Sequence, residues 1–225
     1  ADWWSKPASI PDRPIPSVPS SGGESPLIYS VVFAPTFLFG EVDFLPEDVD
    51  DDVVFAVLPY IPELKSLNLN FTRVTNKGLA AIADLRFLEE LSLSCDWSDR
   101  EPSPITDEGM KVIGMHPSLR WAFVQRMPIT DCGVKYISRS RTIERLVMNG
   151  CPVTSECFVS LADMPMLGAF SCNRFSPDSA PESHWHGFAE PISSRVAQAM
   201  ESLGGRLFCL SIRRVDAHPS FLEAV

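Results

Sequence analysis

Hydrophobic and polar residues in the middle of the chain follow a pattern that returns about every two dozen residues. In each copy apolar residues first alternate with polar ones, as in Leu67 and Leu69, which is typical of a strand with one buried face. A turn follows, and apolar residues then recur at helical spacing, as in Leu79, Ile82 and Leu85. The pattern therefore predicts a series of strand–turn–helix units.

The starting points of the copies show how regular this series is. The first apolar positions of five successive copies are Leu64, Leu88, Leu119, Ile143 and Leu167. The steps are 24, 31, 24 and 24 residues, and the long step contains a seven-residue insertion around "DWSDREPSP". We expect a degenerate copy from Phe39 before them and a partial one from Leu207 after them.

A single unit of this kind exposes apolar residues on both sides, so several must stack to close a core. The fold class predicted is therefore an α/β solenoid arc. Parallel strands line its concave face, short helices form its convex face, and the two ends are irregular caps.

The turn between strand and helix carries a signature of its own. It reads "TRVTNKGL", "SPITDEGM", "MPITDCGV" and "CPVTSECF" in successive copies, with a Thr placed to cap each helix. These units resemble leucine-rich repeats of the T-x-V-T-D-x-G-L subtype found in bacterial, planctomycete-like proteins, and they are similar to the cysteine-containing repeats of F-box proteins. The fourth copy departs from the pattern at Cys157, where the others have Gly, and no F-box precedes the repeats.

The two ends of the chain differ from its middle. Residues 1–26 are rich in Pro and Ser and predict an extended arm. Residues 27–172 are predicted to form the leucine-rich-repeat domain, with five or six repeats that include an N-terminal cap. Within the cap, residues 27–38 are predicted to form a strand or hairpin that covers the first coil. Residues 173–225 predict a long loop, then a capping helix ended by Gly204 and Gly205, and a strand.

Net charge excludes some classes of partner. The 225 residues carry a formal charge of −10 without a cluster of basic residues, which argues against binding to nucleic acid or to an anionic membrane surface. The longest apolar run, residues 27–40, is broken by Pro35 and is shorter than the ~18 residues of a membrane-spanning helix. We expect no direct membrane insertion, but the start at Ala1 leaves open an anchor or targeting segment removed from the chain, and association with a membrane complex.

Six cysteines lack a CxxC pair and any compact disulfide spacing. Free packed thiols are expected, with Cys157 and Cys172 at buried positions of the repeat. This favours the cytoplasm or another reducing compartment.

Residues between the alternating leucines are expected to point out of the concave sheet, in three columns. The first column holds Glu41, Ser66, Glu90, Trp121, Arg145 and Ala169; the second holds Asp43, Asn68, Ser92, Phe123, Val147 and Ser171; the third holds Leu45, Asn70, Ser94, Gln125, Asn149 and Asn173.

An apolar cluster of Trp121, Phe123 and Val147 stands out among these columns, because most other positions are small and polar. Exposed aromatic residues beside an Arg are typical of a protein-binding hot spot. The predicted partner-binding residues are Trp121, Phe123, Arg145, Val147, Gln125 and Glu90. The alternative is that loop 96–104 or 174–195, carrying Trp97 and Trp185, covers the cluster within the same chain.

Candidate chemistry elsewhere is sparse. His184 and His186 would share a face of a strand, but two ligands are too few for a metal site. The acidic run at residues 47–52 lacks the Gly and terminal Glu of a calcium loop and is read as a helix cap. Cys132 lies at a predicted helix start with no base that can be placed beside it. His116, before Pro117, is read as a helix terminator.

The sequence contains no motif for catalysis or phosphate binding, so neither an enzymatic activity nor a cofactor is predicted. The first hypothesis is a non-enzymatic module that binds a protein partner through the concave face. The alternative is a structural subunit of a larger, membrane-associated assembly, docked through its irregular ends and through residues 1–26 with Trp3 and Trp4. A metal-dependent hydrolase using His184 and His186 is the third.

Overall fold

The computed structural model describes residues 30–32, 49–95, 105–173, 188, 191–212 and 219–220. Its strands are β1 Ser30–Val32, β2 Ser66–Asn68, β3 Glu90–Ser94, β4 Trp121–Gln125, β5 Arg145–Val147, β6 Ala169–Ser171 and β7 Cys209–Ser211. Its α-helices are α1 Asp51–Val57, α2 Asn76–Leu79, α3 Met110–Met115, α4 Asp131–Ile137, α5 Cys157–Leu161 and α6 Ser194–Gly204. Short 3₁₀ turns are η2 Leu58–Tyr60, η3 Ala80–Asp84 and η4 Asp107–Gly109.

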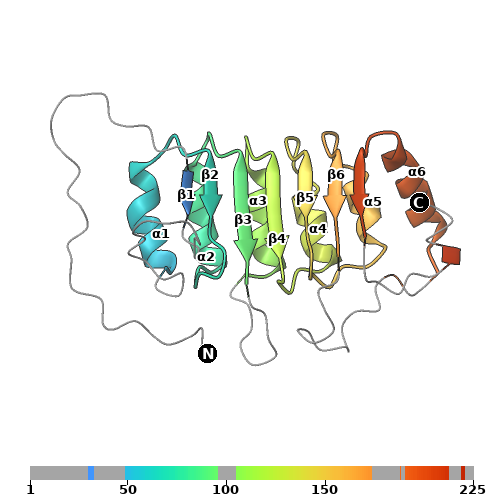
Figure 1. Ribbon diagram of the computed structural model, residues 1–225, viewed down its shortest axis with the longest axis horizontal. Helices are drawn as coiled ribbons and strands as arrows, with labels where there is room; N and C mark the ends of the chain where they lie inside the picture. The colour runs from blue at the N-terminus through green and yellow to red at the C-terminus, as the bar shows by residue number, and fades with distance from the viewer. Residues whose placement is uncertain are drawn as a thin grey trace, which may run out of the picture.

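Within these ranges, seven strands form one sheet in chain order, and every neighbouring pair is parallel. Figure 1 shows the strands side by side along the molecule, with α2 to α5 behind them. Successive helices pack against one another on that side. The predicted α/β solenoid arc is confirmed, with parallel strands on the concave face and short helices on the convex face.

The register explains why the sequence repeats. The second residues of five inner strands are register partners across the sheet, and each is at most 1% exposed: Leu67, Leu91, Ala122, Leu146 and Phe170. The seven-residue insertion between the second and third copies leaves this register unchanged, because it falls after β3 ends and before η4 begins. One continuous core results, as expected for stacked units.

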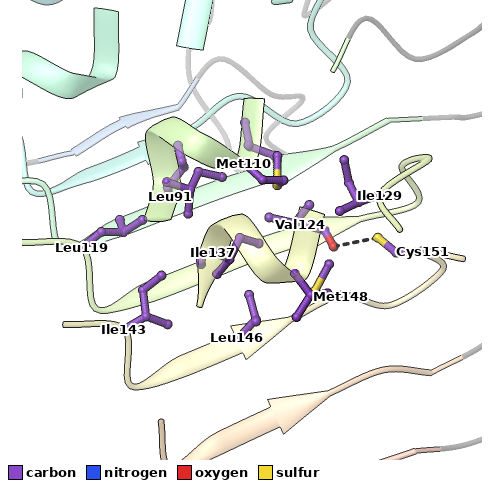
Figure 2. Close-up of a cluster of buried hydrophobic side chains, with 14 of the residues drawn as sticks. Leu91, Met110, Leu119, Val124, Ile129, Ile137, Ile143, Leu146, Met148 and Cys151 are labelled. Carbon is purple, nitrogen blue, oxygen red and sulfur yellow. Dashed lines mark hydrogen bonds between the residues drawn. The ribbon is translucent and has the colours of Figure 1, made fainter. Parts of the chain in front are cut away.

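Figure 2 shows how the two layers share this core. Leu91 and Leu146 come from strands, Met110 and Ile137 come from helices, and all four side chains point into the same space. Burial of such side chains typically stabilises a fold by about 1.5–3 kcal/mol each. One strand and one helix leave this space open toward the neighbouring units, so the units stack instead of folding alone.

The sequence predicts a strand or hairpin within residues 27–38, and β1 lies in that range, but the first column was wrongly assigned at this end of the sheet. We expected Glu41 to open the first column, but Ser30 is the register partner of Ser66, and Val32 is the partner of Asn68. Val31 and Val32 are β-branched and favour a strand, whereas the acidic stretch after Phe39 does not. Residues 33–48, with Glu41, Asp43 and Leu45, lie outside the described residues.

The turn signature links each coil to the next. The carboxylate of Asp51 accepts hydrogen bonds from the backbone N–H (2.8 Å) and the hydroxyl (2.6 Å) of Thr75, one coil later. The same paired bonds join Asp107 to Thr130 and Asp131 to Thr154. An amide serves instead between Asn76 and Thr106. The T-D part of the signature therefore forms a ladder of side chains along the solenoid.

Two of the four threonines also cap their own helices, as predicted, whereas the N-cap of α5 in the fourth copy is Glu156 and not Thr154. The Thr75 and Thr130 hydroxyls accept bonds from the N–H groups of Lys77 and Cys132. Thr106 occupies the N-cap of η4 without such a side-chain bond. The Thr hydroxyl donates its hydrogen to the ladder carboxylate and accepts the helix N–H with its oxygen. A hydroxyl side chain can make both bonds at once.

The glycine of the signature provides room for the ladder. A Cβ atom on Gly133 would lie 2.5 Å from Asp107 Oδ1, and one on Gly78 would lie 2.2 Å from Asp51 Oδ1. Both distances are well inside van der Waals contact, so in these two coils a side chain in place of the glycine would displace the carboxylate, whereas the Asp131–Thr154 bonds form beside a cysteine. In the fourth copy the buried Cys157 takes this position, and α5 begins there.

The C-terminal part adds a further strand and helix to the stack. β7 pairs in parallel with β6, so that Cys209 is the partner of Ala169. The α6 helix packs against α5. Its N-cap is Ser193, whose hydroxyl accepts the Val196 N–H, and its C-cap is Gly205. The domain boundaries at residues 26 and 172 stay predictions, although the sheet itself continues beyond residue 172.

Candidate protein-binding face

All six predicted partner-binding residues lie on strands β3, β4 and β5. The side chains that alternate with them, such as Leu91, Ala122 and Leu146, are buried in the core. The six therefore project from the opposite, concave face of the sheet. They are Glu90, Trp121, Phe123, Gln125, Arg145 and Val147.

The register brings the predicted residues together. Glu90, Trp121 and Arg145 are aligned on β3, β4 and β5, and Phe123 is aligned with Val147. Parallel strands stand about 4.8 Å apart, so the apolar cluster of Trp121, Phe123 and Val147 is continuous. Trp121 is 39% exposed, and the other two are half-buried. An aromatic surface of this kind on a folded chain is typical of a binding site.

A ladder of charges runs beside the cluster, one residue before the first column. Arg120 donates two hydrogen bonds, both of 2.9 Å, to the carboxylate of Glu144. It also lies 3.8 Å from Glu89, which in turn lies 3.8 Å from Lys65. The Arg120 guanidinium is 5.9 Å from the centre of the Trp121 ring, within the range of a cation–π contact.

Sequence reasoning did not find this charge ladder. Its signal was present in the alternation of Lys65, Glu89, Arg120 and Glu144 at equivalent positions of successive copies. The ladder holds Arg120 over the Trp121 ring, and so contributes to the position of that ring.

Two charged side chains of the first column have no such partners. Among the described residues, the Arg145 guanidinium and the Glu90 carboxylate take part in no hydrogen bond, ion pair or ring contact. They stand on either side of Trp121, each one strand away. The first column thus presents a free negative charge, an aromatic ring and a free positive charge in a row.

Two positions of the predicted columns are less exposed than expected. Ser94 is 8% exposed and Ala169 is 5% exposed, so both are buried. Each is a short side chain beside a longer one in the register, Ser94 beside Gln125 and Ala169 beside Arg145. Neighbouring side chains therefore shield them, and neither offers surface to a partner.

Oriented amides flank the apolar cluster. Asn149 Oδ1 accepts the backbone N–H of Asn173 and the hydroxyl of Ser171, both at 2.9 Å. Asn68 Oδ1 accepts the backbone N–H of Asn70 at 3.0 Å. Because a backbone N–H can only donate, these bonds fix which amide atom is oxygen. In the described part of the chain no unpartnered side-chain nitrogen is buried, so the amide nitrogens of Asn68 and Asn149 remain as donors to the solvent.

The six cysteines are free thiols that differ in exposure, and Cys95 is half-buried. Cys151, Cys157 and Cys172 are buried, as expected for the last two, whereas Cys132 and Cys209 are exposed. Burial raises the pKa of the Cys151 thiol to about 12 and that of Cys157 well above its ordinary value. The Cys151 thiol instead contacts the Val124 carbonyl oxygen at 3.3 Å (Figure 2). Buried thiols with such raised pKa values are inert at neutral pH.

The acidic run is a helix cap, as predicted. Asp50 accepts bonds from the N–H groups of Asp52 and Val53, and Asp51 and Asp52 occupy the first turn of α1, where the helix dipole favours negative charge. His116 ends α3. It is also buried, with Nε2 3.2 Å from the Ile82 carbonyl oxygen.

Several residues singled out from the sequence fall where the structure gives no description. His184, His186, Trp97, Trp185 and the arm of residues 1–26 lie outside the described residues. Over the described ranges, no group of three or more His, Cys, Asp or Glu side chains is arranged to hold a metal ion. In the same ranges, no helix has the length and apolar character needed to cross a membrane.

Comparison with known proteins agrees with the repeat pattern. A family model described as "Leucine Rich repeat" matches residues 62–83, and no curated protein matches the chain. One similar solved structure is a chain from the "octameric complex of Latrophilin 3 (Lec, Olf), Unc5D (Ig, Ig2, TSP1) and FLRT2 (LRR)", with 18% identity and a TM-score of 0.37. The match covers 73% of this chain and 59% of that one. Residues 62–83 are thus similar to a leucine-rich repeat, and the parallel sheet with its packed helices has the architecture of an α/β repeat solenoid.

Proposed function

We propose that this protein is a non-enzymatic interaction module that binds a protein partner through the concave face of its solenoid. The observation that carries the proposal is the row of Glu90, Trp121 and Arg145, in which an exposed aromatic ring stands between two unpaired charges. Trp and Arg are the residue types most enriched in interface hot spots. Solenoids present their concave sheets as extended binding surfaces.

The rest of the proposed site follows from the same register. Phe123 and Val147 extend the apolar surface behind Trp121, and Gln125 adds a polar group at the end of β4. A binding site with an apolar centre and polar margins excludes water from its centre when a partner docks. We further propose that the repeats are of the T-x-V-T-D-x-G-L subtype, because the Asp–Thr ladder gives that signature a structural role.

The test begins with affinity purification from the native source and identification of the bound protein. The partner is then produced separately, and its affinity is measured by calorimetry against the double variant Trp121→Ala/Phe123→Ala. We expect a loss of at least about 100-fold, since two hot-spot truncations commonly cost 2 kcal/mol or more each. The melting temperature is expected to change little, because neither side chain is part of the buried core.

A matched control uses Tyr60→Ala. Tyr60 is an aromatic residue with 78% exposure in η2, on the helical side of the solenoid. Its truncation is expected to leave the affinity unchanged. Unchanged binding by the Trp121/Phe123 variant, or an equal loss with the Tyr60 variant, would refute the proposal. Deletion of residues 1–26 is expected to preserve binding, and loss of binding would favour docking through that arm.

A further inference from the structure

We infer that the concave face binds an extended segment of its partner that presents one acidic, one large apolar and one basic side chain to the sheet. The acidic group faces Arg145, the apolar group covers Trp121, and the basic group faces Glu90. This inference rests on the proposed function and adds to it the chemistry of the partner.

The concave face carries two isolated charges. Among the described residues, Glu90 and Arg145 are the charged members of the three outward columns; all the others are neutral. The neighbouring Lys65, Glu89 and Arg120 are already paired with one another. The face therefore has one free charge of each sign, in a chain whose net charge is −10.

Binding of a partner changes the surroundings of these two charges. A partner that covers Trp121 also removes water from the adjacent strands, and a charge that is desolvated without a partner is strongly destabilising. A purely apolar segment would leave Glu90 and Arg145 in that condition. A segment with two acidic groups or with two basic groups would satisfy one site and repel the other. Only a segment of mixed charge satisfies both.

The spacing of the two charges matches that of an extended chain. β3 and β5 are two strand intervals apart, which is about 9.6 Å. A chain in the polyproline II conformation returns to the same side every three residues, after about 9.3 Å. Acidic and basic groups three residues apart on such a chain reach Arg145 and Glu90 together. The two residues between them point about 120° to either side of the sheet-facing direction, so an apolar side chain at the one nearer the second column packs against the side of Trp121 and against Phe123.

Two amide donors favour an extended backbone over a helix. The amide nitrogens of Asn68 and Asn149 are donors without partners among the described residues, oriented by the bonds that their oxygens accept. A partner helix uses its carbonyl oxygens internally, so it would leave these donors unmatched. An extended segment keeps its carbonyl oxygens free to accept from them.

The experiment is a selection from a display library of random twelve-residue peptides, carried out in parallel on four purified proteins. These are the natural chain and the variants Glu90→Arg, Arg145→Glu and Trp121→Ala. Peptides selected by the natural chain should carry one acid and one base about three residues apart, with an apolar residue between. Glu90→Arg should select two acids, Arg145→Glu should select two bases, and Trp121→Ala should select none of these patterns.

Affinity measurements then quantify the preference. Three synthetic peptides with mixed, doubly acidic and doubly basic charges are tested on each protein by fluorescence anisotropy. Each protein is expected to prefer its matched peptide by about tenfold in Kd, the equivalent of one interfacial charge pair. Melting curves check that the variants fold. If a charge reversal does not fold, Glu90→Gln and Arg145→Gln replace it, and they should abolish the preference.

Three outcomes would overturn the inference. One is enrichment of no peptide by the natural chain, and another is selection of the same charge pattern by all charge variants. The third is self-association of the natural chain in sedimentation that the charge variants lose, which would identify a second copy as the occupant. If the selected peptides lack the expected charge pattern while Trp121→Ala/Phe123→Ala still abolishes binding of the purified partner, the proposed function stands. Only the inferred charge pattern of the partner segment is then wrong.

Discussion

Replacing Gly133 by Ala tests the physical basis of the repeat signature. Gly133 lies inside α4, where Ala is ordinarily the better residue by about 1 kcal/mol. Here a Cβ atom would lie 2.5 Å from Asp107 Oδ1 and 2.4 Å from Ile129 Cγ2. Helix propensity therefore predicts that the substitution raises the free energy of unfolding, whereas the contacts in the structure predict that it lowers it.

The size of the effect follows from what must move. The new methyl group displaces the Asp107 carboxylate, which accepts the Thr130 backbone N–H at 2.8 Å and its hydroxyl at 2.7 Å. Hydrogen bonds to charged groups contribute about 1.5–3 kcal/mol each, and solvent exposure at this site places both at the low end. A combined loss of about 3 kcal/mol, offset by about 1 kcal/mol of helix propensity, leaves a net destabilisation of about 2 kcal/mol.

Urea unfolding followed by circular dichroism measures this change in the free energy of unfolding. Gly204→Ala is the matched control, because Gly204 ends α6 and a Cβ atom there meets nothing within 4 Å. The control should be neutral or slightly stabilising. Equal or greater stability for Gly133→Ala, with the control behaving as expected, would show that the glycine does not serve the ladder.

Two further predictions concern titration and reactivity. Burial lowers the pKa of His116 below its ordinary 6.5. Below pH 6.5 the imidazole is therefore protonated more readily in the unfolded chain than in the folded chain. This contribution to stability is complete above pH 6.5 and declines below it by up to about 1.4 kcal/mol per pH unit. The slope of unfolding free energy between pH 7 and pH 5 should therefore be flatter in His116→Gln, and equal slopes would contradict the assignment. Cys132 and Cys209 are exposed, so an aromatic disulfide reagent should label them in the folded protein, whereas Cys151 and Cys157 should react only in denaturant. Rapid labelling of the buried pair would show that the core is open.

Sequence periodicity was sufficient to place the inner strands. The alternation of Leu67, Leu91 and Leu146 with polar residues has a period of two, and its return after 24 or 31 residues leaves one way of stacking. The same periodicity identified which side chains leave the core, so Trp121 and Arg145 could be placed in one row from the sequence. Their role in binding stays a prediction.

Other features depended on contacts between residues far apart in the sequence, and the repeat period does not specify such contacts. Ser30 rather than Glu41 lies beside Ser66, because chain ends lack neighbours on one side and the pattern there is weak. The burial of Ser94 depends on the length of the side chains around it. His116 was predicted only as a helix terminator, and its contact with Ile82 joins residues 34 positions apart.

The sequence by itself determined the period, the solenoid and the outward columns, because alternation along a strand and spacing along a helix are local properties of the chain. Only the tertiary structure decided which charges are paired. Arg120 lies one residue before the first column and Arg145 belongs to that column in the next coil, yet Arg120 is bound by Glu89 and Glu144, whereas Arg145 is free among the described residues. Pairing depends on the distance between side chains from different coils, and that distance exists only after the coils have stacked.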